Sequence, residues 1–177
     1  MNTVDASKSR RTSLRGSVAL FAVCALLIPG GVGCDWVGPR TYRVPTGAML
    51  PTIKVGQTIV VMRLPGGATK VKRGDIIVFR APGEPDKLWI KRAIALGEDT
   101  VELRDRQLYL NGQLVDEPYI KPRTGGTRGF GLDSDNYGPV HVPKEQIIVM
   151  GDNRDNSRDS RTFGPIPQES VVGWVLF

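Results

Sequence analysis

The chain has 177 residues, enough for one domain of ordinary size and too few for two, and its 40% hydrophobic and 24% charged residues exclude a wholly disordered protein. The net charge of +6 is divided evenly: residues 1–34 carry four basic side chains and one acidic one, and the remainder carries 20 and 17. Because the two signs are interspersed in the larger part, its charge pattern is not that of a nucleic-acid-binding surface.

The N-terminal segment has the pattern of a membrane anchor. Residues 1–15 are polar and basic, and residues 16–33 contain no charged side chain. Such a run is just long enough to cross a bilayer, and a basic flank on its N-terminal side indicates that residues 1–15 are cytoplasmic. We expect one transmembrane helix over 16–33, in contact with membrane lipid, and an extracytoplasmic domain over 35–177. A lipoprotein signal ending at Gly33-Cys34 and a buried core helix are the alternatives.

The two cysteines, Cys24 and Cys34, both precede the main domain. In a helix, ten residues at a rise of 1.5 Å would separate them by about 15 Å, too far for a disulfide. Residues 35–177 contain no cysteine, so that domain has neither a thiolate nucleophile nor a zinc–thiolate site.

After position 35 the sequence predicts short strands joined by turns. Runs rich in β-branched residues occupy residues 57–62, 75–79, 88–96, 100–103, 146–149 and 171–177. Asn111-Gly112 predicts a hairpin turn within residues 108–115, because both residues tolerate a positive φ. Residues 116–140, rich in Gly, Pro and Asp, predict a long excursion from the sheet. No stretch of 12 or more residues has a helical period, so we expect a mostly β domain.

Three segments carry residue types that are associated with catalysis. They are residues 43–53 (RVPTGAMLPTI), residues 73–79 (RGDIIVF) with 89–93 (WIKRA), and residues 151–161 (GDNRDNSRDSR).

The second segment suggests a lysine base. His141 is the single histidine and has no serine nucleophile motif beside it, so we expect a surface residue rather than a member of a Ser-His-Asp triad. A free lysine has a pKa near 10.4 and acts as a base only if burial lowers that pKa. On a strand, Lys91 shares its face with Trp89 and Ala93, an apolar wall that disfavours the ammonium form, and Arg92 points the other way.

The third segment is rich in Asp and Asn, as calcium loops are. An EF-hand loop requires oxygen ligands at alternate positions and a glycine at the sixth. Counted from Asp152, the third position is Arg154 and the sixth is Ser157. We therefore expect no metal ion here, and charge pairing such as that of Asp159 with Arg161 explains the composition better.

The order and wording of the three segments resemble those of the bacterial type I signal peptidases, membrane-bound serine endopeptidases with a Ser/Lys dyad. The resemblance covers about residues 40–177. It implies a signal-peptidase-type fold of coiled antiparallel sheets and the removal of signal peptides from exported preproteins through an acyl-enzyme. No cofactor is implied, and the preferred substrates would carry small residues at the first and third positions before the cut.

The resemblance also implies roles for individual residues. Lys91 would be the general base, Ser157 would orient it by a hydrogen bond, and the N–H of residue 48 with the Thr46 hydroxyl would stabilise the oxyanion. Residues that shape the site would be Met49, Pro51, Arg92, Gly151, Asp152, Asp159 and Arg161.

The sequence departs from the family at the nucleophile. The family places its serine directly before the methionine, where this chain has Ala48, and alanine cannot attack a carbonyl. Three interpretations stay open: an inactive paralogue, a nucleophile supplied by Thr46 or another hydroxyl, and a serine-to-alanine variant made to trap a complex. On an extended segment, Thr46 would point to the same side as Ala48.

Two other functions compete with the peptidase. The first is a membrane-tethered protein that binds signal peptides, or assists an active paralogue, without cutting. The second is a cytoplasmic Ser/Lys autoprotease of the repressor type, which the expected topology and the lack of a DNA-binding domain disfavour.

Overall fold

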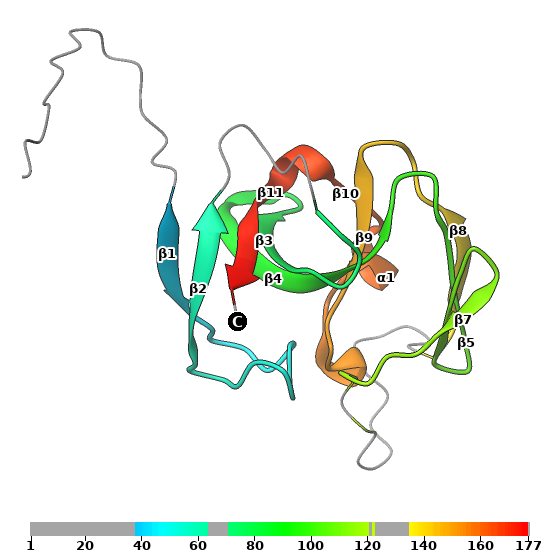
Figure 1. Cartoon of the computed structure of the whole chain (residues 1–177), viewed down its shortest axis with the longest axis horizontal. Helices are drawn as coiled ribbons and strands as arrows, with labels where there is room; N and C mark the ends of the chain where they lie inside the picture. Colours follow the sequence, from blue (N-terminus) through cyan, green and yellow to red (C-terminus); the bar gives the residue numbers. More distant parts are fainter. Residues whose placement is uncertain (1–37, 64–70, 121, 123–134, 177) are drawn as a thin grey trace, which may run out of the picture. The chain divides into compact units, whose positions relative to one another are not determined.

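The computed structural model describes residues 38–63, 71–120, 122 and 135–176 (Figure 1). The expected cytoplasmic tail, the expected anchor over 16–33 and both cysteines lie outside these ranges. Within the ranges, no helix is long and apolar enough to cross a membrane.

A large antiparallel sheet forms most of the described structure. Its strands neighbour one another in the order β1-β2-β11-β3-β4-β9-β10. Their bounds are β1 Pro39–Arg43, β2 Thr58–Arg63, β3 Ile76–Ala81, β4 Glu84–Leu96, β9 Gln146–Met150, β10 Ile166–Pro167 and β11 Val171–Leu176. The long strand β4 is central, because β3 pairs with it over residues 84–92 and β9 over residues 92–96.

A smaller antiparallel sheet follows β4 in the chain, in the order β7-β6-β5-β8. Its strands are β5 Thr100–Arg104, β6 Gln107–Leu110, β7 Gln113–Val115 and β8 Tyr137–His141. The described helical elements are single turns: η1 Arg154–Asn156, α1 Ser160–Phe163 and η2 Gln168–Ser170.

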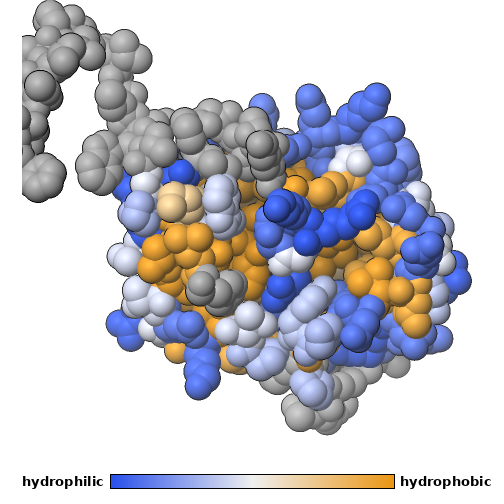
Figure 2. Space-filling model, viewed as in Figure 1, coloured by the Kyte–Doolittle hydropathy of each residue, from blue (hydrophilic) through white to orange (hydrophobic). Residues whose placement is uncertain are grey.

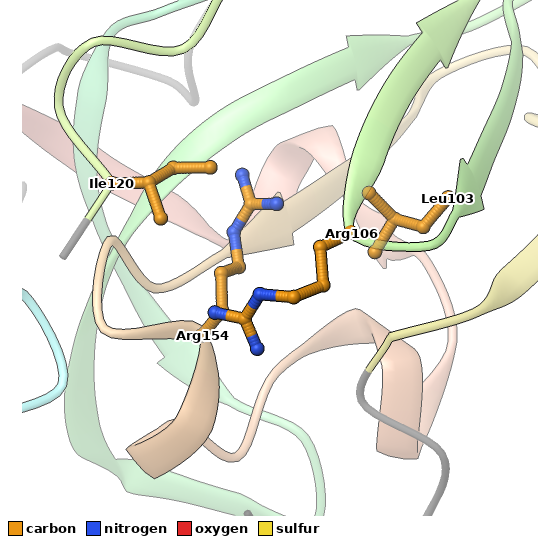
Figure 3. A pocket seen from close by; sticks show the side chains of 4 residues that line it. All are labelled: Leu103, Arg106, Ile120 and Arg154. Atoms are coloured by element: carbon orange, nitrogen blue, oxygen red, sulfur yellow. The ribbon is translucent and has the colours of Figure 1, made fainter. Parts of the chain in front are cut away.

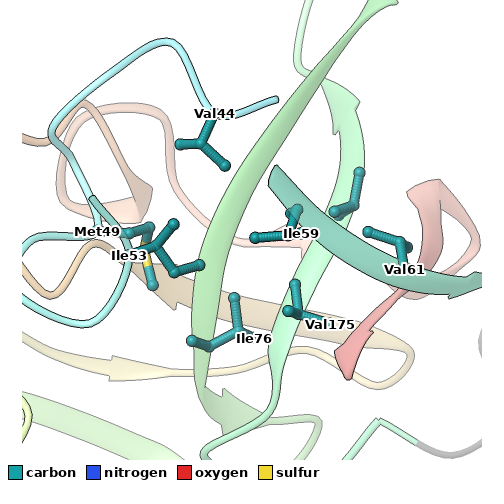
Figure 4. Packing of buried hydrophobic residues seen from close by; sticks show 8 residues of the cluster. Val44, Met49, Ile53, Ile59, Val61, Ile76 and Val175 are labelled. Atoms are coloured by element: carbon teal, nitrogen blue, oxygen red, sulfur yellow. The ribbon is translucent and has the colours of Figure 1, made fainter. Parts of the chain in front are cut away.

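Alternation along the strands gives the large sheet two apolar faces. One face packs under residues 44–53, where Val44, Met49 and Ile53 meet side chains of β2, β3 and β11 (Figure 4). Farther along the same sheet, residues of β4 and β9 pack against the small sheet. The other face carries a separate cluster that includes Ile77, Phe79 and Val149, with Trp89 and Phe163 packed against it.

The predicted strands agree closely with the observed ones. The hairpin is confirmed, because Asn111 and Gly112 have φ values of 52° and 79° and Leu110 pairs with Gln113. The prediction that residues 116–140 leave the sheet is wrong at its end, where β8 begins at Tyr137 and pairs with β5. The prediction missed this strand because Gly138 and Pro139, both poor strand formers, stand inside it.

Candidate active site

Lys91 is buried in β4, with 6% of its surface exposed. Its Nζ lies 5.8 Å from the centre of the Trp89 ring and donates a hydrogen bond of 3.2 Å to the Ile90 carbonyl. Burial lowers the pKa of Lys91 from 10.5 to about 8; the Asp159 carboxylate opposes this change and Arg161 assists it. A lysine in this state supplies a useful fraction of neutral amine near neutral pH, as a general base requires.

Gly151 is the point at which the other two segments meet this strand. Met150 pairs with Arg92, and Gly151 is the next residue, directly after the end of β9. An ideal Cβ at position 151 would lie 2.5 Å from the Ala48 carbonyl oxygen and 2.3 Å from Ser157 Oγ. The backbone at Ala48 and the side chain of Ser157 therefore both lie directly against Gly151, which only a glycine permits.

The segment that carries Ala48 is held from two sides. Met49 and Ile53 are fully buried and point into the apolar cluster beneath the segment (Figure 4). The Asn153 backbone N–H donates to the Ala48 carbonyl at 3.0 Å, and Asn153 Nδ2 donates to the Gly47 carbonyl at 2.9 Å. The Ala48 N–H makes no hydrogen bond to any other described residue and is free to donate to a bound group.

The loop 151–161 is organised around a buried carboxylate. Asp159 accepts hydrogen bonds from Arg161 Nε and NH2, each 2.9 Å long, and from the Gly151 N–H at 3.0 Å. Burial alone would raise the pKa of Asp159, but the bonds from Arg161 outweigh it and leave that pKa below 3.8. The predicted pairing of Asp159 with Arg161 is confirmed.

Arg92 and Asp152 form a second buried ion pair beside Lys91. Arg92 Nε and NH2 donate to the two Asp152 oxygens at 2.8 and 2.6 Å, and Arg92 NH1 donates to the Gly74 carbonyl at 2.7 Å. The Thr52 hydroxyl donates to the same carboxylate. The pair therefore ties β4 to the loop 151–161 and to the segment that carries Ala48.

Some predicted contacts are absent. Ser157 Oγ is buried and does not donate to Lys91, so the predicted bond between them is not formed in this structure; it lies close enough to the Asp159 carboxylate to help lower the pKa of that group. The assumption of an extended segment at Thr46 is wrong: the chain bends at residues 46–47 and turns at 48–52, leaving Thr46 exposed and Ala48 buried. Pro51 lies exposed in that turn, and His141 is exposed on β8, as expected.

Sequence reasoning missed the acidic and aromatic residues that cover Arg92 and Arg154. Glu117 and Tyr119 lie in a turn after β7, outside the three segments that the sequence associates with catalysis. Their signal in the sequence is faint, because a short Glu-Pro-Tyr run without periodicity resembles any polar loop.

The arrangement combines a buried amine at Lys91 with residue 48, which has a free backbone N–H and a side-chain position that could carry a nucleophile. Within the described residues, no three His, Cys, Asp or Glu side chains gather as metal ligands. Activation of a hydroxyl at position 48 by Lys91, with stabilisation of an oxyanion, is the chemistry that this set of groups can perform.

Comparison with known proteins connects this geometry to one family. The family described as "Signal peptidase, peptidase S26" matches residues 15–177. Signal peptidase I V of Bacillus subtilis (strain 168) is 36% identical over 174 residues, which cover 95% of this chain and 97% of that protein. Signal peptidase I S of the same organism is 35% identical and covers 91% of this chain and 84% of its own length.

A solved structure is also similar. A signal peptidase I from Enterococcus faecalis V583 has 35% sequence identity and a TM-score of 0.49, covering 62% of this chain and 98% of the other. The family match over nearly the whole sequence and the identity to full-length relatives are sufficient for assignment. The chain belongs to the bacterial type I signal peptidase family, peptidase S26.

Proposed function

We propose that this protein is a membrane-bound signal peptidase of the Ser/Lys type in which Ala48 occupies the position of the nucleophile. Because alanine cannot attack a carbonyl, the chain with Ala48 binds preproteins but cleaves them poorly or not at all. The observation that carries the proposal is that Lys91 is buried in β4 within electrostatic reach of Asp159, which accepts from the N–H of the same Gly151 against which Ala48 and Ser157 lie. Burial of the Lys91 ammonium would destabilise the fold, so a buried amine whose pKa is lowered toward neutral supports a chemical role rather than a structural one.

With a serine at position 48, the reaction follows from these groups. The neutral Lys91 amine accepts the serine proton while Oγ bonds to the scissile carbonyl carbon, and the oxyanion accepts hydrogen bonds from the residue 48 N–H and the Thr46 hydroxyl. The Lys91 ammonium then protonates the leaving amine as the C–N bond breaks. Lys91 next takes a proton from water while the water oxygen bonds to the ester carbon, and it returns that proton to the serine Oγ as the C–O bond breaks, which releases the new carboxylic acid for ionisation in solvent.

A free strand edge beside Lys91 supports an extended substrate. Residues 84–90 of β4 pair with β3 on one side, whereas β9 pairs with β4 only from Arg92 onward. Within the described residues, no other strand pairs with this part of β4. An extended preprotein segment could add to the edge by backbone hydrogen bonds and bring its scissile bond to Lys91.

Attachment to a membrane is the remaining part of the proposal. It rests on the uncharged segment 16–33 behind a basic tail, a pattern that supports an extracytoplasmic position for residues 35–177. Apolar side chains gather on one face over β2, β11 and β3 (Figure 2). Val60 and Leu176, paired across β2 and β11, are 38% and 42% exposed. Such a face favours contact with a lipid surface.

Restoring the nucleophile tests the catalytic part. Ala48→Ser should cleave a preprotein with small residues at the first and third positions before the cut, thousands of times faster than the chain as written. Ala81→Ser, which adds a hydroxyl at another buried alanine, is the control and should leave cleavage unchanged. If the unaltered chain cleaves well and Thr46→Val abolishes cleavage, Thr46 is the nucleophile and the role of position 48 is wrong.

The same experiment addresses the competing function. A non-cutting protein that recognises signal peptides would bind the preprotein equally well with and without the Ala48→Ser substitution, and it would cleave the preprotein in neither form. That result would overturn the peptidase proposal.

A reporter that is active only outside the cytoplasm tests the topology when fused after Phe177. It should be active, and a cytoplasmic reporter at the same point should be inactive; the reverse pattern would overturn the proposed orientation. Mass spectrometry of the membrane-extracted protein distinguishes an anchor from a lipoprotein, because an intact Met1 start excludes lipidation at Cys34.

A further inference from the structure

The turn formed by residues 117–120, here called the 117–120 clamp, binds the two arginines that flank the candidate site. Arg92 Cζ lies over the Tyr119 ring, 3.8 Å from the ring centre. Arg154 NH2 donates to Glu117 Oε1 at 2.6 Å, and both side chains are at most 5% exposed. The Tyr119 hydroxyl donates to the same Glu117 oxygen at 2.7 Å, which joins the two contacts into one unit.

The clamp reaches Gly151 through Arg154. Arg154 Nε donates to the Gly151 carbonyl at 3.2 Å, while the Gly151 N–H donates to Asp159 on the other side. Both polar groups of the Gly151 backbone are therefore occupied by side chains that are themselves held in buried ion pairs. The carbonyl side depends on Glu117, and the N–H side depends on Arg161.

The clamp also covers the remaining face of Arg92. The guanidinium edge is occupied by Asp152 and by the Gly74 carbonyl, so Tyr119 closes the flat side of the group against solvent. Burial raises the pKa of the Tyr119 phenol, which keeps the hydroxyl protonated and able to donate to Glu117. The neighbouring strand position is Lys91, so a shift of Arg92 moves the lysine backbone with it.

The space beside the clamp is too small for a ligand. Leu103, Arg106, Ile120 and Arg154 line a cavity of about 20 Å³ (Figure 3), enough for one water molecule. Arg106 is held there by Asp135 and Asp155. A positioning role therefore fits this cluster better than a binding role.

We propose that Glu117 and Tyr119 are positioning residues for the peptidase site, holding Arg92, the residue next to Lys91 on β4, and the carbonyl of Gly151, against which the Ala48 backbone lies. This inference rests on the proposed function for its catalytic meaning. Neither residue belongs to the three sequence segments that define the site, and neither touches the reacting groups.

The effect of the clamp should be visible at Lys91. The charged groups that face the amine are Asp159 and Arg161, and Arg158 lies over the same Trp89 ring with its Cζ 5.5 Å from the ring centre. None of these belongs to the clamp. If the clamp is lost, Arg92 and Gly151 can shift and admit water to the amine, and the desolvation that holds the Lys91 pKa down is relieved.

The first measurement titrates Lys91 by NMR of ¹³Cε-labelled lysine in the chain as written, which needs no cleavage. Tyr119→Leu removes the ring from Arg92, and we expect it to raise the Lys91 pKa from about 8 toward 10.5. Tyr119→Phe keeps the ring and should stay close to the parent. Tyr109→Leu is the control: it removes a similar ring, whose centre lies 4.7 Å from Cζ of the exposed Arg104 on the small sheet, and it should leave the Lys91 pKa unchanged.

The second measurement uses the Ala48→Ser background. Tyr119→Leu should lower kcat by about tenfold to a hundredfold with little change in KM, since small misplacements of catalytic groups have effects of this size. The rising limb of the pH–rate profile should move to higher pH, together with the Lys91 pKa. A loss of folded protein alone would reduce the rate without moving that limb.

Glu117→Gln keeps the inference testable if Tyr119→Leu does not fold. The amide is a weaker acceptor for Tyr119 and Arg154, so a smaller rise in the Lys91 pKa is expected. A folded Tyr119→Leu or Glu117→Gln protein with an unchanged Lys91 pKa would overturn the positioning role. Failure of Ala48→Ser to cleave any preprotein would overturn the proposed function instead, and the NMR titration would still decide the role of the clamp.

Discussion

Gly151 leaves no room for a side chain beneath the carbonyl oxygen of Ala48. The 2.5 Å between that oxygen and an ideal Cβ at position 151 is closer than real Cβ contacts come, and the opposing atom is backbone. Any larger residue must push residues 47–49 away from β4 or displace the loop 151–161. The glycine therefore sets the distance between the nucleophile position and the strand that carries the base.

We predict that Gly151→Ala in the Ala48→Ser background abolishes most cleavage and lowers the free energy of unfolding by about 1–3 kcal/mol, as overpacking of a buried site does. Urea unfolding and a preprotein cleavage assay measure the two effects. Gly83→Ala is the control: its Cβ would meet open space, and its φ of +75° predicts a small strain cost without loss of activity. Normal cleavage by Gly151→Ala would show that this contact does not position the site.

The central strands of the core could be predicted because both of their faces are buried and their sequences are therefore strongly apolar. Residues 75–79 and 146–149 are nearly continuous apolar runs, as central strands buried on both faces should be. Strand β1 was missed because it is an exposed edge, and its sequence, Pro-Arg-Thr-Tyr-Arg, lacks that signal.

Contacts in the site could be predicted where the two residues are close together in the sequence. Trp89 and Lys91 share a face of one strand, so their contact follows from spacing alone. The contacts of Arg92 with Tyr119 and of Arg154 with Glu117 join residues 27 and 37 positions apart, and only the folded topology brings them together. The exposure of Thr46 was missed for a local reason: the segment bends where an extended chain was assumed.

We predict that the Ala48→Ser enzyme gains activity as the pH rises through about 8, the pKa of Lys91. The reason is that only the neutral amine accepts the serine proton, and burial makes that form available well below 10.5. The pH dependence of kcat/KM measures this limb. Lys91→Arg should be inactive throughout, because guanidinium stays charged, and His141→Ala should retain the parent profile. Near-normal turnover by Lys91→Arg would exclude Lys91 as a base.

We predict that Lys91→Met stabilises the protein at pH 7 by up to about 3 kcal/mol. This is the free energy that corresponds to a pKa of about 8 when folded and 10.5 otherwise. Between these values the unfolded chain binds a proton that the folded chain does not, so the free energy of unfolding of the parent rises with pH across that window. Urea unfolding at pH 7 and pH 10 measures the difference, which should shrink at the higher pH.

Lys54→Met is the matched control for that measurement. Lys54 is exposed, so the substitution should change the free energy of unfolding by no more than about 0.5 kcal/mol at either pH. A Lys91→Met protein that is less stable than the parent at pH 7 would mean that the amine is stabilised by its surroundings and is not held there at a cost.

We predict that Asp159→Asn lowers the free energy of unfolding by about 3–5 kcal/mol at neutral pH, because it removes one charge of the buried ion pair between Asp159 and Arg161. The folded pKa of Asp159 is depressed, so the stabilisation is fully present above its ordinary value of 3.8 and is lost as the pH falls through the lower folded pKa. The difference between parent and variant, measured by urea unfolding, should therefore persist from pH 7 to about pH 4 and shrink below that. Asp86→Asn, at an exposed position, should show no such difference.

In the Ala48→Ser background, Asp159→Asn removes the charge that raises the Lys91 pKa, so the rising limb of the pH–rate profile should move to lower pH. A limb that moves to higher pH would mean that Asp159 acts on Lys91 by closing the loop against water, and that its charge is secondary.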